Sequence, residues 1–458
     1  MPLTSLSVTP YLDDASGYTG QAAEAFAPDN LNQLREIVTR AARTKTPITI
    51  AGAGTGLTGA RVPQGGFVVS LERFKRLSIE AGRAQCGAGV LLEDIHAQAA
   101  RTRQFFGPNP TEATASVGGI ISTNAGGARS YGFGAVRHHV LSLEVTFMDG
   151  QTRRVTRNDK VDFPVPALRR PATTKDSAGY YMEPGVDWVN LLSGSEGTLG
   201  IITEAELQLI PQPPAILSGV VFFPADENAL DAVDEWRSVP RLRLLEYMDA
   251  PSLNLLRPVN SDIPGHARAA LMIEQDLQSE NDDEIDRWTG RLAAHHALED
   301  DSWFGFTAAD RDRFRDFRHT LPTIVVERAR KSGFPKFGTD FAVPLHRSRE
   351  LLQFYRTRCE ALFPGSHLIF GHVGDANVHV NLLPDTAEKA SRGEGLIDEF
   401  ARFTVSLGGT VAAEHGIGKI KTDLLKLMYS PAEIDSMRDV KRRLDPDFLL
   451  GRGTIFEP

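Results

Sequence analysis

The chain has 458 residues, of which 41% are apolar and 24% are charged, as in an ordinary globular protein of two or three domains. Its formal net charge is −9 and no long basic run is present, which argues against nucleic acid as a partner. Two cysteines, Cys86 and Cys359, are too few for a disulfide framework or an iron-sulfur cluster, and no run of 18 apolar residues could span a membrane.

Helical periodicity and short apolar runs alternate with glycine-rich loops in the first 214 residues. An Asp-Gly turn closes one of the strands, and a basic, proline-bearing stretch follows it. The pattern predicts helices over 30–42 and 90–101, strands over 47–51, 67–71, 140–148 and 201–210, and an excursion or hairpin loop over 151–172.

A proline cluster at residues 211–214 is the best domain boundary. Beyond it, strands separated by helices predict an α+β domain with an antiparallel sheet. We therefore expect domains over 1–214, 215–410 and 411–458. The predicted strands are 219–223, 242–248 and 269–275, and the predicted helices are 227–237 and 284–295.

The first glycine-rich loop reads GAGTGLTG over residues 52–59, with four glycines in eight residues. It contains a G-x-G-x-x-G match, but the dinucleotide fingerprint needs a helix to open there, and Pro63 and another strand follow instead. A tight strand-to-strand turn is the plain alternative. The glycines exceed what a turn needs, which favours a backbone that lies against a pyrophosphate.

Three further motifs follow in order: GGIISTNAGG (118–127), KDSAGY (175–180) and GSEGTLG (194–200). With the first loop, they resemble the vanillyl-alcohol oxidase/p-cresol methylhydroxylase type of FAD-binding domain. Within that superfamily the whole chain resembles the D-2-hydroxyacid dehydrogenases, the branch of D-lactate, glycolate and D-2-hydroxyglutarate dehydrogenases. The implied fold is a two-subdomain FAD-binding domain, an antiparallel-sheet α+β substrate domain, and a C-terminal helical tail that returns to the FAD domain.

The resemblance implies FAD along these loops. The first loop would wrap the pyrophosphate, the second would line the flavin and ribityl chain, and Ile201 and Ile202 would lie beside the adenine or the isoalloxazine. Covalent members often carry a His in the first loop; this loop has none, so we expect non-covalent FAD. The implied cofactor-binding residues are Gly52, Ala53, Gly54, Thr55, Gly56, Leu57, Thr58, Pro110, Thr111, Ala115, Ser116, Gly118, Gly119, Ser122, Thr123, Asn124, Gly197, Gly200, Ile201 and Ile202.

Two histidine motifs lie near the C-terminal end, GHVGDANVHVN (371–381) and EHGIGK (414–419). Residues 368–373 and 378–382 are strand-like around a turn, which predicts a hairpin. Alternation then places His379 and Asn381 on one face, where His372 of the paired strand can join them. Imidazole and carboxylate are ligands that zinc and similar metals prefer, although a single strand histidine is more often structural.

In relatives with these motifs, the two histidines and the glutamate bind a divalent metal, usually zinc or manganese, and the next histidine is the base. Carried over, His372, His379 and Glu414 hold the metal, His415 takes the proton, and Asn381 contacts substrate. The metal would lower the hydroxyl pKa of a chelated 2-hydroxyacid, and hydride would leave C2 for flavin N5.

A carboxylate substrate also needs a cation. Arg318 is the first candidate, because its guanidinium can bind a carboxylate in a bidentate manner, and Lys336 is the second. The alternative for either residue is a surface cation paired with a nearby acid.

The sequence thus predicts an FAD- and metal-dependent D-2-hydroxyacid dehydrogenase that passes electrons to a separate acceptor, such as a quinone, a cytochrome or an electron-transfer flavoprotein. Two alternatives stay open: a flavin transferase like alkyl-dihydroxyacetonephosphate synthase, and a flavoprotein subunit of a multi-subunit glycolate oxidase. The chain start lacks the pattern of a signal peptide, so we expect a cytoplasmic location, with peripheral membrane contact and a homodimer left open.

Overall fold

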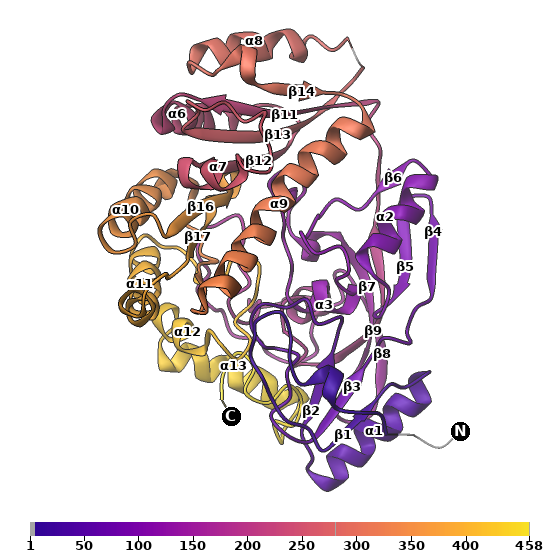
Figure 1. The fold of residues 1–458 in the computed structure, drawn as a ribbon. Coiled ribbons are helices and arrows are strands. Elements are labelled where there is room, and N and C mark those ends of the chain that lie inside the picture. Colours follow the sequence, from indigo (N-terminus) through magenta and orange to yellow (C-terminus); the bar gives the residue numbers. More distant parts are fainter. Residues whose placement is uncertain (1–4, 280, 458) are drawn as a thin grey trace.

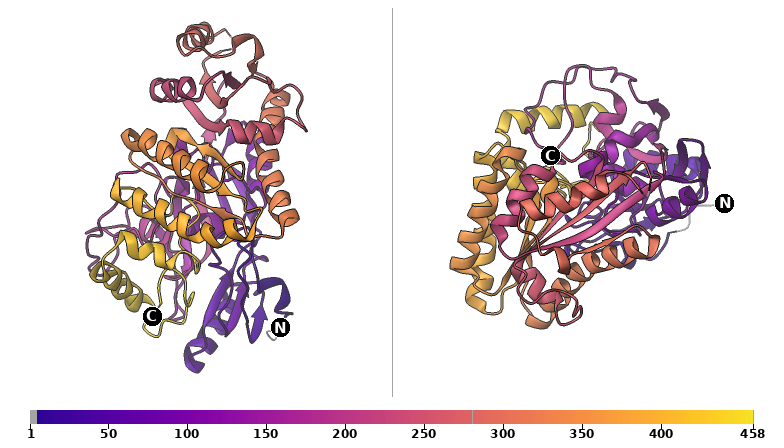
Figure 2. Two further views of the ribbon diagram at one scale, coloured as in Figure 1. Left: turned by 60° about the vertical axis from the view of Figure 1, so that its left-hand side comes forward. Right: turned by 90° about the horizontal axis from the view of Figure 1, so that it is seen from above.

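The computed structural model describes residues 5–279 and 281–457. Within them, strands form a three-, a five-, a seven- and a two-stranded sheet. In Figure 1 the first half of the chain lies to the lower right, the middle third lies above and to the left, and the yellow C-terminal end returns toward the first half. The two further views in Figure 2 show the same return.

A small parallel sheet, in the order β1-β3-β2, contains the first strands of the chain. Helix α1 packs on it because Leu34, Ile37 and Val38 recur at helical spacing and are fully buried against Phe26 and Phe67. The first predicted helix and the first two predicted strands are present. The bounds are β1 (Glu24–Phe26), α1 (Leu31–Thr44), β2 (Ile48–Ala51) and β3 (Phe67–Ser70).

An antiparallel sheet follows, in the order β4-β5-β9-β7-β8. Part of the stretch predicted as an excursion or hairpin loop is β8, which pairs with β7. A short helix, α3, forms in the second glycine-rich motif because Ser116 caps it and Val117, Ile120 and Ile121 are buried. The bounds are β4 (Leu77–Glu80), β5 (Arg83–Gly87), α2 (Leu92–Arg101), β6 (Gln104–Phe105), α3 (Val117–Ser122), α4 (Ser130–Phe133), β7 (Val140–Thr146), β8 (Thr152–Thr156), α5 (Trp188–Leu192), β9 (Ile201–Gln208) and β10 (Ile210–Pro211).

The largest sheet is antiparallel and has the order β14-β11-β13-β12-β16-β17-β15. Its strands bury both faces: on β12, Leu245 and Tyr247 join one apolar cluster, and Leu244 and Met248 join the other. Helices α6, α8 and α10 contribute to the first cluster, and α7 and α9 to the second. The predicted α+β architecture is confirmed. The bounds are β11 (Ala215–Phe223), α6 (Asp226–Trp236), β12 (Leu242–Asp249), α7 (Ala250–Leu256), β13 (Ala269–Leu277), α8 (Glu284–Ala294), β14 (Trp303–Gly305), α9 (Ala308–Ser332), β15 (Phe337–Gly338), α10 (Ser348–Leu362), β16 (His367–His372), β17 (Asn377–Leu382) and α11 (Ala387–Ser406).

The C-terminal segment returns to the first sheet, as predicted. It contains α12 (Thr422–Met428) and α13 (Pro431–Leu444). The Ile48 N–H donates to the Leu449 carbonyl (2.8 Å), and the Lys441 ammonium of α13 donates to the Thr198 carbonyl (2.9 Å). The division at 214 and 410 stays a proposal for the domain limits.

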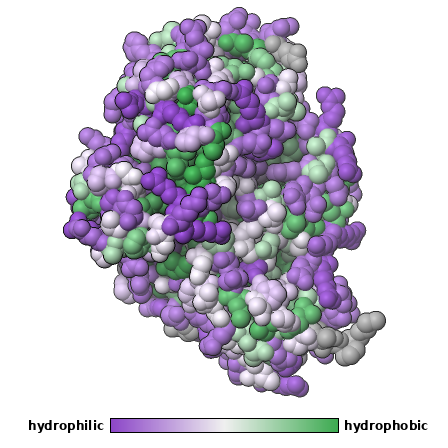
Figure 3. Space-filling view, in the orientation of Figure 1, coloured by the Kyte–Doolittle hydropathy of each residue, from purple (hydrophilic) through white to green (hydrophobic). Residues whose placement is uncertain are grey.

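Among the described residues, we find no helix with the length and hydrophobicity that a transmembrane span requires. Figure 3 shows hydrophilic residues over much of the face that it draws, with smaller hydrophobic areas between them.

Candidate functional site

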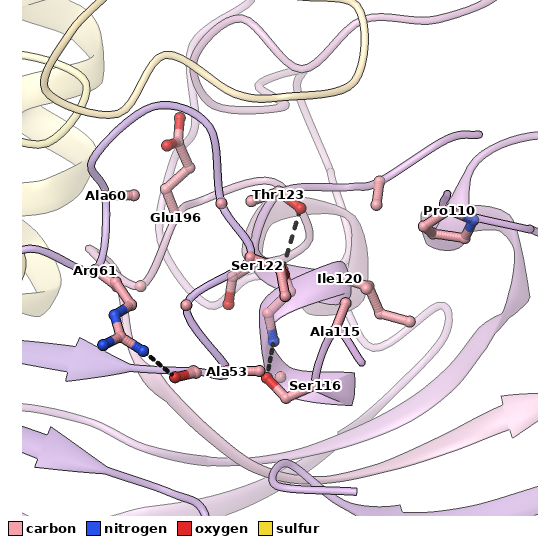
Figure 4. Close-up of a pocket in the computed structure, with 18 of the residues that line it drawn as sticks. Ala53, Ala60, Arg61, Pro110, Ala115, Ser116, Ile120, Ser122, Thr123 and Glu196 are labelled. Carbon is pink, nitrogen blue, oxygen red and sulfur yellow. Dashed lines mark hydrogen bonds between the residues drawn. The ribbon is translucent and has the colours of Figure 1, made fainter. Parts of the chain in front are cut away.

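A cavity of about 250 Å³ lies where the glycine-rich loops meet the loop that carries His415. Its walls come from the turn after β2, the segment that enters α3, the turn before β9, and residues 414–415. Figure 4 shows Arg61 on one side of it and Pro110 on the other. Every residue that the sequence predicts to bind the cofactor lines this cavity, except Asn124.

The turn after β2 presents backbone to the cavity with few side chains in the way. Gly54 has a φ of +87°, which favours glycine, and a Cβ there would lie 2.7 Å from the Arg61 Nη1 atom. Arg61 Nη1 donates to the Gly52 carbonyl (2.8 Å), as Figure 4 shows, and fixes the turn. A backbone of this kind suits the phosphates of a dinucleotide.

The opposite wall is more apolar. Helix α3 begins at Ser116, whose hydroxyl accepts the Gly119 N–H (3.4 Å), and Ile120 faces the cavity from the same helix. Ile201 and Ile202 line it from β9 and are almost fully buried. A cavity with glycine backbone on one side and buried aliphatic side chains on the other fits a ligand that carries both phosphates and a flat ring, as FAD does.

Asn124 lies behind the cavity wall. Its side-chain oxygen accepts the Arg137 N–H (3.0 Å), and its amide donates to the Asp176 carbonyl (3.4 Å). Asn124 therefore ties the second glycine-rich motif to the KDSAGY segment.

The hairpin of β16 and β17 brings the predicted metal ligands together. In its register, His379 is opposite Phe370 and His372 is opposite Asn377, so both histidines face the same side. Glu414 Oε1 lies 2.9 Å from His372 Nε2 and 3.6 Å from His379 Nε2. One ligand atom from each of the three residues lies within 4.8 Å of the others, which is an arrangement that can hold a metal ion.

An oxygen atom of a neighbouring residue also contacts the Nδ1 atom of each of these histidines. His372 Nδ1 contacts Glu246 Oε1 (2.5 Å), and His379 Nδ1 contacts the Thr339 carbonyl oxygen (2.9 Å). Metal-binding histidines are commonly oriented by a carboxylate or carbonyl in this way. Burial alone would lower the pKa of His372, but the carboxylates of Glu246 and Glu414 outweigh it and raise that pKa.

The second oxygen of Glu414 faces a different set of donors. Oε2 accepts from the Lys175 ammonium (2.9 Å) and from the Gly127 N–H (2.7 Å). Burial would raise the pKa of Glu414, but His372 and Lys175 outweigh it and hold that pKa well below its usual range. The carboxylate is therefore charged, with one oxygen directed at the histidines.

His415 lies between the three predicted metal ligands and the cavity. Its ring is stacked on that of His379, with centroids 5.5 Å apart, and its Nδ1 lies 3.5 Å from Asp340 Oδ2. Partial burial lowers the pKa of His415 to about 4, although Asp340 opposes this effect. His415 also lines the cavity, so an uncharged imidazole is present there at neutral pH.

The two predicted carboxylate-binding cations occupy different environments. Arg318 donates from Nε to Glu246 Oε2 (2.7 Å) and from Nη1 to Thr111 Oγ1 (3.1 Å), so it is paired with the acid that also orients His372. Lys336 is exposed to solvent over much of its surface. Its ammonium donates to the buried Asn381 side chain (3.2 Å), and desolvation lowers the pKa of Lys336.

Several residues of this site are absent from the sequence predictions. Glu246 is a buried carboxylate in the middle of the mostly apolar strand β12, and a buried acid in such a strand is a signal that could have singled it out. Glu196 lines the cavity and accepts the N–H groups of Ile417 and Gly418 (2.8 Å each). It therefore fixes the loop that carries His415.

Comparisons with known proteins agree with this geometry. Residues 22–156 match the model of an FAD binding domain, and residues 212–455 match that of the C-terminal domain of FAD linked oxidases. The chain is 31% identical to the D-lactate dehydrogenase of Archaeoglobus fulgidus, over 95% of this chain and 92% of that protein. It is 27% identical to the glycolate oxidase subunit GlcD of Bacillus subtilis, over 97% and 91%.

A solved structure of alkyldihydroxyacetonephosphate synthase has the same fold, with a TM-score of 0.69. The match covers 95% of this chain and 77% of that one, at 15% sequence identity, so it bears on the fold alone.

Proposed function

We propose that this chain, which belongs to the family of FAD-linked oxidases, oxidises a D-2-hydroxyacid to the 2-keto acid with non-covalent FAD and a divalent metal, zinc or manganese. The observation that carries the proposal is the convergence of His372, His379 and Glu414 beside His415, at the wall of the cavity that fits FAD. When bound, FAD supplies a hydride acceptor and the metal supplies a Lewis acid.

His415 is the proposed base. Its uncharged imidazole can accept the hydroxyl proton of the substrate, and it lies at the cavity wall where that hydroxyl would be. Asp340 faces Nδ1 at 3.5 Å and accepts the His415 backbone N–H (2.9 Å), so it orients the ring and stabilises the imidazolium that forms.

The substrate carboxylate would be bound from the β17 side. Asn381 lies two residues from His379 on the same face of the strand, and Lys336 donates to it. Arg318 supports the site in another way, because it neutralises the acid that orients His372.

Electrons would then pass to a separate acceptor, a quinone, a cytochrome or an electron-transfer flavoprotein. A relative named as a glycolate oxidase subunit supports a partner protein as one form of this acceptor. The alkyl-transfer alternative has only a shared fold behind it.

The test is anaerobic mixing of the flavin-loaded protein with the D and L forms of lactate, 2-hydroxyglutarate and larger 2-hydroxyacids, and with glycolate. We expect rapid loss of the oxidised-flavin absorbance with a D form and none with its L form. If no acid reduces the flavin in protein that holds both FAD and metal, the proposed function is wrong.

A further inference from the structure

A second, smaller cavity lies next to Arg318 and is not explained by flavin or metal binding. Its volume is about 130 Å³, and it lies between α9, the strands β11, β12 and β13, and residues 109 and 128–129 of the first half of the chain. Figure 1 shows α9 running across the molecule between the largest sheet and the first half. Arg318 lines this cavity and donates to Thr111 (3.1 Å), which lines the first cavity, so this hydrogen bond joins the walls of the two cavities.

The cavity combines an apolar floor with a basic rim. Leu244, Met272, Ile273 and Phe314 supply the aliphatic and aromatic surface, and all are buried. One water molecule occupies about 30 Å³, so there is room for a group of a few non-hydrogen atoms. The rim carries four arginines, Arg129, Arg311, Arg315 and Arg318, against two carboxylates, Glu274 and Asp312.

Three of these arginines are already paired. Arg129 makes two bonds to Glu274 (2.8 and 3.3 Å), Arg315 lies 2.9 Å from Asp312, and Arg318 is bound to Glu246. Arg311 differs. It donates to the Phe306 carbonyl (2.9 Å), and no carboxylate of a described residue lies within 4.0 Å of its guanidinium.

A buried hydroxyl points to a missing ligand in the same cavity. Ser218 lines it from β11 and is 1% exposed. Its Oγ has no hydrogen-bond partner within the part of the chain that the structure describes. A buried polar atom usually has a partner, and Ser218 lines the same cavity as Arg311, whose guanidinium is paired with no carboxylate of a described residue. A hydroxyl and a guanidinium of this kind are suitable donors for an anion.

We propose that this cavity is a subsite for the far end of the substrate, and that the substrate is a 2-hydroxyacid with a second carboxylate at the end of a short methylene chain. The apolar floor takes the methylenes, and Arg311 and Ser218 bind the second carboxylate. Glu274 does not repel this carboxylate strongly, because Arg129 neutralises it. The inference rests on the proposed function, since it extends the substrate from the same site.

The test compares two 2-keto acids of equal length, 2-oxoglutarate and 2-oxopentanoate, which differ only in a terminal carboxylate or methyl group. Their dissociation constants for the flavin- and zinc-loaded protein are measured by calorimetry. Neither can reduce the flavin, so binding is read without turnover. We expect 2-oxoglutarate to bind more tightly, and Arg311→Gln to reduce the ratio of the two constants by about tenfold or more.

Ser218→Ala should reduce the ratio by about threefold, since it removes a neutral hydrogen bond. Arg328→Gln is the matched control, because Arg328 is exposed on the same helix and loses the same charge. If Arg311 only donates to the Phe306 carbonyl, its substitution shifts the dissociation constants of both keto acids equally. An unchanged ratio of the two constants therefore overturns the subsite. Failure of 2-oxoglutarate to bind overturns it as well.

Anaerobic flavin reduction by 2-hydroxyglutarate and 2-hydroxypentanoate separates the two proposals. An Arg311-dependent binding ratio without flavin reduction by either acid would refute the proposed function and leave the subsite standing. Flavin reduction by either acid, together with a ratio of dissociation constants that does not depend on Arg311, would refute the subsite and leave the proposed function standing.

Discussion

Lys175→Met removes a buried positive charge without much change in side-chain volume. Lys175 is 2% exposed and lies 2.9 Å from Glu414 Oε2 and 3.5 Å from Asp375 Oδ2. Its ammonium also lies 3.4 Å from the Gly127 carbonyl and from the Asn377 side-chain oxygen. Without Lys175, Glu414 and Asp375 are left buried with less compensating charge.

The expected cost follows from this geometry. Removal of one partner from a buried ion pair typically lowers the free energy of unfolding by about 3–5 kcal/mol, because the other charge stays buried and unpaired. We expect a loss of about this size in chelator-treated protein, measured by urea denaturation. A bound divalent cation would supply positive charge to Glu414, so the loss should be smaller with zinc present.

Lys441→Met is the matched control. Lys441 is also buried and pairs with Asp445 (2.9 Å), in the C-terminal segment and away from the proposed metal ligands. Its substitution should destabilise the protein by a similar amount with and without zinc. A Lys175→Met variant that loses less than about 1 kcal/mol, or whose loss does not depend on zinc, would refute the charge argument.

Three further predictions test the supports of the site. Glu246→Gln should weaken zinc binding by about 10- to 100-fold in competition with a chelating dye, because His372 loses its orienting carboxylate; unchanged affinity would contradict this role. Gly418→Ala should lower the flavin content of the purified protein, since φ is +56° and a Cβ would lie 2.0 Å from the Thr58 carbonyl oxygen; a full flavin content would show that the two loops need not touch. Burial raises the pKa of Glu196 to about 7 from an ordinary value of 4.5, so the folded state holds this proton more tightly than the unfolded state. Its stabilising contribution is therefore present below pH 4.5 and is lost as the pH rises to about 7. Glu196→Gln should reduce the loss of unfolding free energy across this window by about 3 kcal/mol, at about 1.4 kcal/mol per pKa unit. Parallel stability curves for variant and wild type would contradict it.

The sequence predicts the parts of the site that depend on local pattern. Alternation places His379 and Asn381 on one face of their strand, and the register of the hairpin in the structure puts His372 on that face too. The glycine-rich loops that line the first cavity are also visible as a local pattern, because a backbone that approaches a ligand excludes side chains.

Contacts between distant segments could not be read from local pattern. Glu246 is 126 residues from His372, and only the pairing of β12 with β16 brings the two strands together. Lys175 is 239 residues from Glu414. The resemblance names the segment that contains Lys175, but no local rule joins it to the proposed metal ligands.

Helix α9 shows a different limit. It contains Pro322, which argues against a continuous helix, and most of its residues are polar, so no prediction covers it. Phe314, Phe317, Leu321 and Val325 are nevertheless buried at spacings of three and four, which holds the helix against the sheet. This helix positions Arg318.

The most direct test of the central claim is the rate of anaerobic flavin reduction by the best D-2-hydroxyacid, measured in wild type before and after metal removal and in His415→Ala. The account predicts rapid reduction in the metal-loaded wild type, a large loss after chelation that zinc or manganese restores, and a loss in His415→Ala that added metal does not restore. Reduction at the wild-type rate in the chelated protein or in His415→Ala, with full flavin content, would contradict it.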